Sequence, residues 1–324
     1  MPYTVAVREL CEFTAKQGDL DLRFTPAPTA QEGIAGHALV YERRGPDYRR
    51  EVTLSGEFGD LRVRGRADGF DPARRRLEEI KTFRGSLDRQ RPTHRRLHWA
   101  QAKVYAWLQC QADDLPDIEV ALVYLDLGSQ EETVLTERCT AAELRTHFES
   151  LCARFLAWAA LELDHRERRD TALQALRFPF GDFRVGQRPL AEAVYRAAAS
   201  GRCLLAQAPT GIGKTMGTIF PLLKAAPGQR LDKVFFLAAK TSGRQTALDA
   251  IERLAPAAPL RVLELVARDK ACEHPDQACN GESCPLARGF YDRLHAARSA
   301  ALRIGQDLDT HEAHERDEIG RAHV

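Results

Sequence analysis

Apolar residues recur along the first part of the chain with two different spacings, and each spacing predicts a type of element. Residues 5–17 have the spacing of an amphipathic helix, and a Thr-x-x-Glu capping box at Thr29 opens a second helix to about residue 43. Alternating apolar and polar positions then predict three strands, and a turn at residues 71–72 joins the last two. These strands are expected at residues 51–58, 61–68 and 76–83.

The same patterns continue to about residue 170 and complete a first domain. A helix is expected at residues 94–111, followed by strands at 118–127 and 133–139. A second capping box at Thr140 opens a long helix to about residue 164. The charged run at 165–170 is interpreted as an exposed linker. This order of elements predicts an α/β domain.

Short apolar runs in the second half of the chain predict a further α/β domain. Residues 203–206 and 261–266 predict strands, and the continuous apolar run at 233–239 is typical of a parallel strand buried on both faces. A helix is expected to begin at Lys214, directly after a glycine-bearing turn. The length of 324 residues is consistent with about two domains.

Charge and composition narrow the classes of function only slightly. The net charge is +1, so no global positive field attracts nucleic acid, although arginines cluster locally at residues 43–50, 74–76 and 89–96. The absence of a signal peptide and of a membrane-spanning apolar run predicts a cytoplasmic protein without a membrane partner. Eight cysteines in such a protein favour metal binding or inert thiols over disulfides. Cys11, Cys110, Cys139 and Cys152 lack metal-ligand spacing and are interpreted as inert.

Three charged residues in the predicted hairpin suggest a catalytic metal site. Glu79 and Lys81 are two residues apart on one strand, so their side chains point the same way, and Asp68 ends the neighbouring strand. Two carboxylates can hold Mg²⁺ or Mn²⁺, which activates a bound water, and Lys81 can orient that water. Without further support, this pattern is also typical of a solvated polar face.

The order Asp, hairpin, Glu-Ile-Lys resembles the core of the PD-(D/E)XK nucleases. Gln101 and Tyr105, in the helix after the Glu-Ile-Lys strand, and His37, in the helix before the hairpin, resemble the RecB-like branch of that family. The resemblance implies a domain with a mixed sheet flanked by helices. It also implies an active nuclease, because no required residue is missing. In this family, the metal would be held by His37, Asp68, Glu79 and the backbone carbonyl of Ile80, with Lys81 assisting catalysis and Gln101 and Tyr105 helping to place DNA.

The stretch from Ala206 to Thr215, AQAPTGIGKT, combines a predicted strand, a glycine-bearing turn and a helix N-terminus, which together make a phosphate site. Lys214 would reach the β- and γ-phosphates of ATP, and the Thr215 hydroxyl would hold Mg²⁺. The stretch resembles motif I of superfamily 2 helicases, with Gln187 in a Q motif and residues 240–245 as motif Ia. The nucleotide site implied by this resemblance comprises Gln187, Ala208, Pro209, Thr210, Gly211, Ile212, Gly213, Lys214 and Thr215.

Three clustered cysteines follow the last predicted strand. Cys272, Cys279 and Cys284 lie in one Pro- and Gly-containing segment, which suggests zinc or an iron–sulfur cluster. The segment resembles the iron–sulfur domain of XPD/DinG helicases, so a fourth cluster ligand is expected beyond residue 324. The acidic motif II of such ATPases is absent, and the final residues 318–324 match a translated sequencing adapter. The chain is therefore expected to be the N-terminal fragment of a longer protein.

These resemblances together predict a helicase–nuclease. A RecB-like PD-(D/E)XK nuclease domain is expected at residues 1–170, the first part of a P-loop RecA-like helicase domain at 176–266, and a partial iron–sulfur domain at 267–324. The resemblance implies ATP-driven translocation of the complete protein on single-stranded DNA and a role in DNA repair. Two alternatives remain open: a non-catalytic clamp on single-stranded DNA, and a nuclease whose ATP-binding part is a regulatory switch.

Overall fold

The computed structural model describes residues 3–23, 27–238, 241–265, 267, 270 and 272–307 of this α/β protein. The chain divides into two compact units. The first unit combines residues 1–159 with 267–299, and the second combines 160–266 with 300–324. The first unit therefore contains both the predicted hairpin and the cysteine segment.

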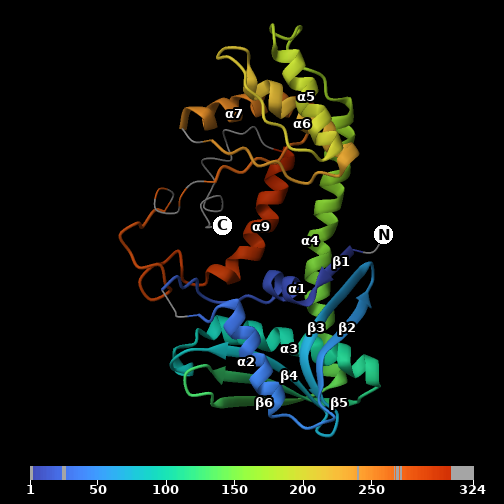
Figure 1. Cartoon of the computed structure of the whole chain (residues 1–324), viewed down its shortest axis with the longest axis vertical. Helices are drawn as coiled ribbons and strands as arrows, with labels where there is room; N and C mark the ends of the chain where they lie inside the picture. The colour runs from blue at the N-terminus through green and yellow to red at the C-terminus, as the bar shows by residue number, and fades with distance from the viewer. Residues whose placement is uncertain are drawn as a thin grey trace. The chain divides into compact units, whose positions relative to one another are not determined.

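The first unit is built on a six-stranded mixed sheet, labelled in Figure 1. Its strand order is β1-β3-β4-β5-β6, and β2 also pairs with β3. The β1–β3 and β4–β5 pairs are parallel and the other pairs are antiparallel, which confirms the predicted mixed sheet. The strands are β1 (Tyr3–Ala6), β2 (Arg49–Phe58), β3 (Leu61–Asp71), β4 (Arg76–Phe83), β5 (Asp117–Asp126) and β6 (Glu132–Thr140).

Helices cover both faces of this sheet, and the central strand β5 is buried on both. Val120, Leu122 and Tyr124 belong to the larger core under α1, α3 and α4, whereas Val123 and Leu125 pack with α2, which crosses the other face (Figure 1). The predicted capping boxes are both present, at Thr29 and Thr140. The helices are α1 (Val7–Thr14), α2 (Ala30–Glu42), η1 (Leu87–Arg89), α3 (Pro92–Asp113), α4 (Ala141–Ala175) and the start of α9 (Phe290–Asp307).

Two local predictions in the first half of the chain are wrong. Residues 5–17 do not form one helix, because Tyr3–Ala6 pair with β3 as a strand and the helix begins only at Val7. The run at 165–170 is not a linker, because α4 continues through it to Ala175. His165 is buried there and Arg166 pairs with Asp232, so this part of α4 packs within the second unit.

The second unit contains helices but lacks the predicted strands. Its elements after α4 are α5 (Gln187–Ser200), α6 (Lys214–Gln229), α7 (Thr241–Leu254) and η2 (Ala255–Ala257). The described residues within 203–206, 233–239 and 261–266 are irregular, and Leu205, Phe235 and Leu237 are 102%, 73% and 91% exposed. A strand is held by hydrogen bonds to neighbouring strands, and none of these runs pairs with another where the structure describes them. The predicted parallel sheet is therefore not formed in this part of the chain.

The cysteine segment packs against a short stretch that precedes α2. Leu20 donates its backbone N–H to Ala287 O at 2.9 Å, and Leu22 donates to Cys279 O at 2.9 Å. The Leu20 side chain packs with Cys284 and Ala287 in a small apolar cluster. No described helix is long and apolar enough to cross a membrane.

Candidate functional site

Asp68, Glu79 and Lys81 come together where β3 and β4 lie side by side. The antiparallel register pairs Gly69 with Glu78, which places Asp68 and Glu79 next along the two strands. Asp68 Oδ2 accepts a hydrogen bond from the Ile80 backbone N–H at 2.7 Å, and Lys81 Nζ lies 2.5 Å from Glu79 Oε1. Backbone pairing therefore fixes both carboxylates and the ammonium in one place.

The charge balance of this cluster favours the binding of a cation. Burial raises the pKa of both Asp68 and Glu79, although the Lys81 charge acts in the opposite direction. Burial lowers the pKa of Lys81, but the charges of Glu79 and Asp68 outweigh burial, so the net pKa is raised and Lys81 stays protonated. Glu79, which is buried, and Asp68, which is partly buried, thus share one ammonium. A divalent cation would stabilise such a site. The carboxylate oxygens of Asp68 and Glu79 are ligands of the kind that Mg²⁺ prefers.

Helix α2 contributes two side chains to the same cluster. His37 Nδ1 lies 3.6 Å from Asp68 Oδ1, and burial, together with the Lys81 charge, lowers the pKa of His37. His37 is therefore neutral at neutral pH, the form in which an imidazole binds metal. Tyr41 donates its hydroxyl hydrogen to the Asp68 backbone carbonyl at 3.1 Å. Tyr41 was not predicted from the sequence, although it follows His37 by four residues and so shares its helix face.

Helix α3 brings Gln101 and Tyr105, each 8% exposed, to the strands that carry the carboxylates. The Tyr105 ring lies directly on β3 at Gly65, where an added Cβ would be 2.6 Å from the tyrosine hydroxyl oxygen. Burial raises the pKa of Tyr105, and the charges of Glu79 and Asp68 raise it further, so this hydroxyl is close to the cluster. Gln101 makes no side-chain hydrogen bond with any residue that the structure describes.

A histidine that was not predicted lies next to these groups. His98 Nδ1 is 3.0 Å from the hydroxyl of the buried Tyr124, which pairs with Lys81 across β4 and β5. Burial, helped by the Lys81 charge, lowers the pKa of His98 to about 3. His98 is therefore a neutral, structural neighbour of the cluster. His98 precedes Gln101 by three residues, and this spacing could have suggested that both side chains lie on the same face of α3.

The structure describes all the predicted metal-binding side chains of the first unit. No three His, Cys, Asp or Glu side chains among the described residues already form a compact ligand group. The residues that fit a cation are the carboxylates of Asp68 and Glu79, with His37 beside Asp68. The three cysteines of the predicted cluster also do not form such a group: Cys284 is buried, and Cys272 Sγ accepts a hydrogen bond from His274 N–H at 3.4 Å.

The glycine-bearing turn in the second unit contains two glycines in the left-handed conformation and leads directly into a helix. Gly211 and Gly213 have φ of +85° and +79°, a left-handed conformation that favours glycine, and α6 begins at Lys214 as predicted. Lys214 Nζ donates to the carbonyls of Ala208 and Pro209 at 3.2 and 2.9 Å. The predicted residues from Ala208 to Thr215 therefore lie in one loop and at the N-terminus of one helix.

Gln187 and Arg184 support this loop from the start of α5. The buried amide of Gln187 donates to Gly213 O at 3.0 Å and accepts from Arg184 N–H at 3.0 Å. The Arg184 guanidinium donates to Gly211 O at 2.8 Å. The amide of Gln187 is thus engaged with the protein backbone, whereas the resemblance to a Q motif implied contact with the nucleotide. The hydrogen bond from Arg184 to the loop was not predicted, because it depends on how the residues before α5 pack on the loop in three dimensions.

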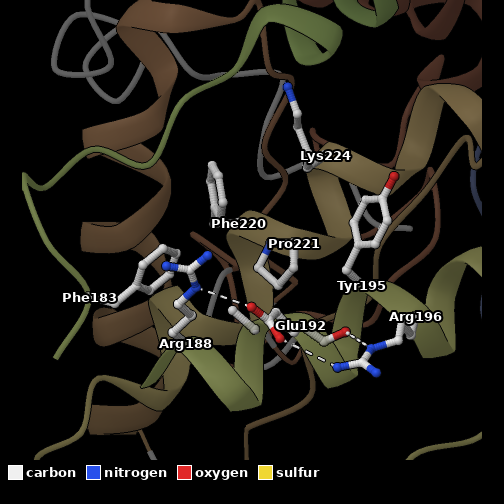
Figure 2. Close-up of a pocket in the computed structure, with 9 residues that line it drawn as sticks. Phe183, Arg188, Glu192, Tyr195, Arg196, Phe220, Pro221 and Lys224 are labelled. Carbon is white, nitrogen blue, oxygen red and sulfur yellow. Dashed lines mark hydrogen bonds and ion pairs between the residues drawn. The ribbon is translucent and has the colours of Figure 1, made fainter. Parts of the chain in front are cut away.

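A hollow of about 470 Å³ lies between α5 and α6. Figure 2 shows Glu192 between Arg188 and Arg196, with which it forms ion pairs at 3.1 and 3.4 Å. The wall also contains aromatic rings and one lysine, but no residue of the loop from Ala208 to Gly213. The lining residues are Phe183, Arg188, Ala191, Glu192, Tyr195, Arg196, Phe220, Pro221 and Lys224.

Comparisons with known proteins give little further information on the site. No family model and no curated protein matches the chain. The solved structure titled "Crystal structure of SSO0001" is similar to it, with 21% sequence identity. The match covers 47% of this chain and 77% of that chain, with a TM-score of 0.31.

Proposed function

We propose that the first unit is a metal-dependent nuclease that hydrolyses phosphodiester bonds in DNA. The observation that carries the proposal is the cluster of Asp68, Glu79 and Lys81, in which a partly buried and a buried carboxylate share one ammonium. His37 from α2 and Tyr105 from α3 lie beside it, so two helices and two strands bring five residues to one place. A solvated polar face would not have this burial or this convergence.

Each residue of the cluster would have its own role in hydrolysis. Asp68, Glu79 and His37 would hold Mg²⁺ or Mn²⁺, which lowers the pKa of a bound water and stabilises negative charge on the phosphodiester. Lys81, protonated and fixed against Glu79, would donate hydrogen bonds to the water or to a phosphate oxygen. In the reaction, a water oxygen bonds to phosphorus, the P–O ester bond breaks, and the leaving oxygen takes a proton. Tyr41 and the Ile80 N–H would keep Asp68 in place.

The second unit supports a further proposal, that the chain binds ATP with Mg²⁺ as the first part of a helicase motor. The left-handed glycines and the start of α6 support it, because backbone N–H groups at a helix N-terminus bind phosphate. Lys214 would exchange its bonds to loop carbonyls for bonds to the phosphates, and Thr215 would bind Mg²⁺. Translocation on single-stranded DNA, the iron–sulfur cluster and a role in DNA repair are proposals for the complete protein.

The nuclease proposal is tested by metal-dependent cleavage of labelled single-stranded and duplex DNA. The parent chain should cleave in Mn²⁺, and Lys81→Ala should lower the rate at least about 100-fold, because it removes the positioned ammonium. The matched control is Lys103→Ala, which removes a lysine of α3 that pairs with Glu137 on β6 and lies outside the cluster. This control should keep the parent rate.

Each other outcome favours a different function. Equal cleavage by the parent and Lys81→Ala would mean that this cluster is not the catalytic site. Binding of single-stranded DNA without cleavage by any variant would favour the non-catalytic clamp. Cleavage that depends on ATP, without translocation by a full-length version, would favour a nuclease regulated by its ATP-binding part.

A further inference from the structure

Three arginines follow one another along the exposed side of β3. Arg62, Arg64 and Arg66 are exposed, and the residues between them, Val63 and Gly65, face the interior. Successive residues on one side of a strand are about 7 Å apart, a spacing comparable to that of consecutive phosphates along an extended nucleic acid strand. Two residues beyond Arg66, the same strand carries Asp68. The three arginines therefore form a line that leads to the candidate catalytic cluster.

Two of these guanidinium groups have no counter-ion among the residues that the structure describes. Arg66 pairs with Glu51 at 3.3 Å, but the side chains of Arg62 and Arg64 make no hydrogen bond or ion pair with any described residue. Many other arginines of the first unit are paired; Arg44, for example, binds both Glu78 and Glu132. An exposed arginine without an anionic partner keeps all its donors available for an external anion.

The strands beside β3 add small polar groups and little negative charge to this surface. The β2 register places Thr53 opposite Arg66, Ser55 opposite Arg64 and Glu57 opposite Arg62. On the other side, β1 places Thr4 beside Arg62. Thr4, Thr53 and Ser55 are exposed, and hydroxyl groups of this kind also bind phosphate oxygens. Glu51 and Glu57 are the anionic side chains at these positions, so cations predominate.

We propose that Arg62, Arg64 and Arg66 bind consecutive phosphates of single-stranded DNA and guide the strand along β3 into the cluster of Asp68, Glu79 and Lys81. This inference rests on the proposed nuclease function. The contacts are to the backbone, so binding along β3 is independent of base sequence. The edge formed by β1, β3 and β2 gives the protein a local cationic surface although its net charge is only +1.

The experiment measures DNA binding by the full chain separately from cleavage. Arg62→Gln/Arg64→Gln is compared with the parent by fluorescence anisotropy, using a labelled single-stranded oligonucleotide in EDTA at several salt concentrations. The matched control is Arg74→Gln/Arg75→Gln, which removes two exposed arginines from the turn at the opposite end of β3. The β3 variant should bind about tenfold more weakly in low salt. The slope of log affinity against log salt should become shallower by about 1.4, because two phosphate contacts are lost.

The outcomes separate this inference from the proposed nuclease function. An unchanged affinity and slope in the β3 variant, an equal loss in the control, or no binding by the parent would overturn the inference, even if the parent cleaves DNA through Lys81. Loss of binding in the β3 variant alone would support it, even if the parent does not cleave. An equal effect on duplex DNA would overturn the assignment to a single strand. Unchanged melting temperatures of both variants confirm that the fold is kept.

Discussion

Adjacent carboxylates on β4 have opposite environments, and this difference decides which of them is available for chemistry. Glu78 accepts hydrogen bonds from Arg44 at 2.8 Å and from Tyr48 at 3.0 Å. Glu79 lies with Asp68 and Lys81, where two carboxylates share one cation. Removing a partner from a buried ion pair leaves an uncompensated charge, so Glu78 has a structural role in holding Arg44. Only Glu79 remains for metal binding.

We expect the Asp68 carboxylate to support cleavage but to lower the stability of the folded protein when no metal is bound. Because burial raises the pKa of this carboxyl, the folded protein binds its proton more tightly than the unfolded chain, and stability falls as pH rises through the raised pKa. Asp68→Asn removes this effect and keeps an oxygen for the Ile80 N–H. In EDTA at pH 7, we expect the melting temperature of Asp68→Asn to equal or exceed that of the parent, rising about 2–4 °C for each kcal/mol of stability gained. In a separate assay with Mn²⁺, this variant should lose cleavage.

A matched control for this prediction is Asp126→Asn. The Gly128 backbone N–H, together with Ser129, lowers the pKa of Asp126, so this carboxylate stabilises the fold at neutral pH. Its amide variant should melt below the parent. A melting temperature of Asp68→Asn well below that of the parent would mean that the carboxylate is already compensated by Lys81, and that no cation is needed to balance the site.

At the scale of elements, local patterns correctly predicted the helix and strands that carry the candidate site, because the sequence marks where these elements begin and end. The capping box of α2, in which Thr29 Oγ1 accepts from Glu32 N–H, fixed the register that places His37 near Asp68. The alternation in β4 likewise put Glu79 and Lys81 in one cluster. Tyr3–Ala6 could not be predicted in this way, because their extended form depends on pairing with β3, about 58 residues away in the register. Contacts of this range leave no periodic signal.

The packing of the cysteine segment against the stretch that precedes α2, both within the first unit, is another long-range feature. Asp19 is central to this packing. Its carboxylate accepts the Gly289 N–H at 2.7 Å, and it lies so close to Gly281 that a Cβ there would overlap its side chain. Asp19→Ala removes one hydrogen bond, worth about 1 kcal/mol, so the open form of the segment should become about fivefold more populated. Trypsin cleavage after Arg288 should accelerate by the same factor.

The control for Asp19 is Asp47→Ala, an exposed position in the turn after α2 that makes no side-chain interaction with the described residues. Its tryptic pattern should match that of the parent. If Asp19→Ala left cleavage after Arg288 unchanged, the hydrogen bonds of Leu20 and Leu22 would be sufficient to hold the segment.

At the scale of the whole molecule, the two units differ in how completely their strands are paired. In the first unit, every strand predicted from the sequence finds a neighbour, and the sheet buries two cores. In the second unit, the apolar content of the predicted strands was recognised correctly but their secondary structure was not. Apolar composition indicates that a segment can be buried. Strand formation also needs a neighbouring strand whose backbone N–H and C=O groups are available for pairing. The sequence alone does not show whether that partner is present.

Hydrogen exchange by mass spectrometry tests this difference directly. Backbone amides of β3, β4 and β5 should be strongly protected, because each strand pairs with neighbours on both sides over part or all of its length. Amides of residues 203–208, 233–238 and 261–265 should exchange close to the rate of an unstructured peptide, because their backbone groups face solvent. Helix α6 is the internal control, since its hydrogen bonds should protect it although it lies between two of these runs. Protection of the three runs comparable to that of β5 would instead mean that they pair in solution as the strands that the sequence predicts.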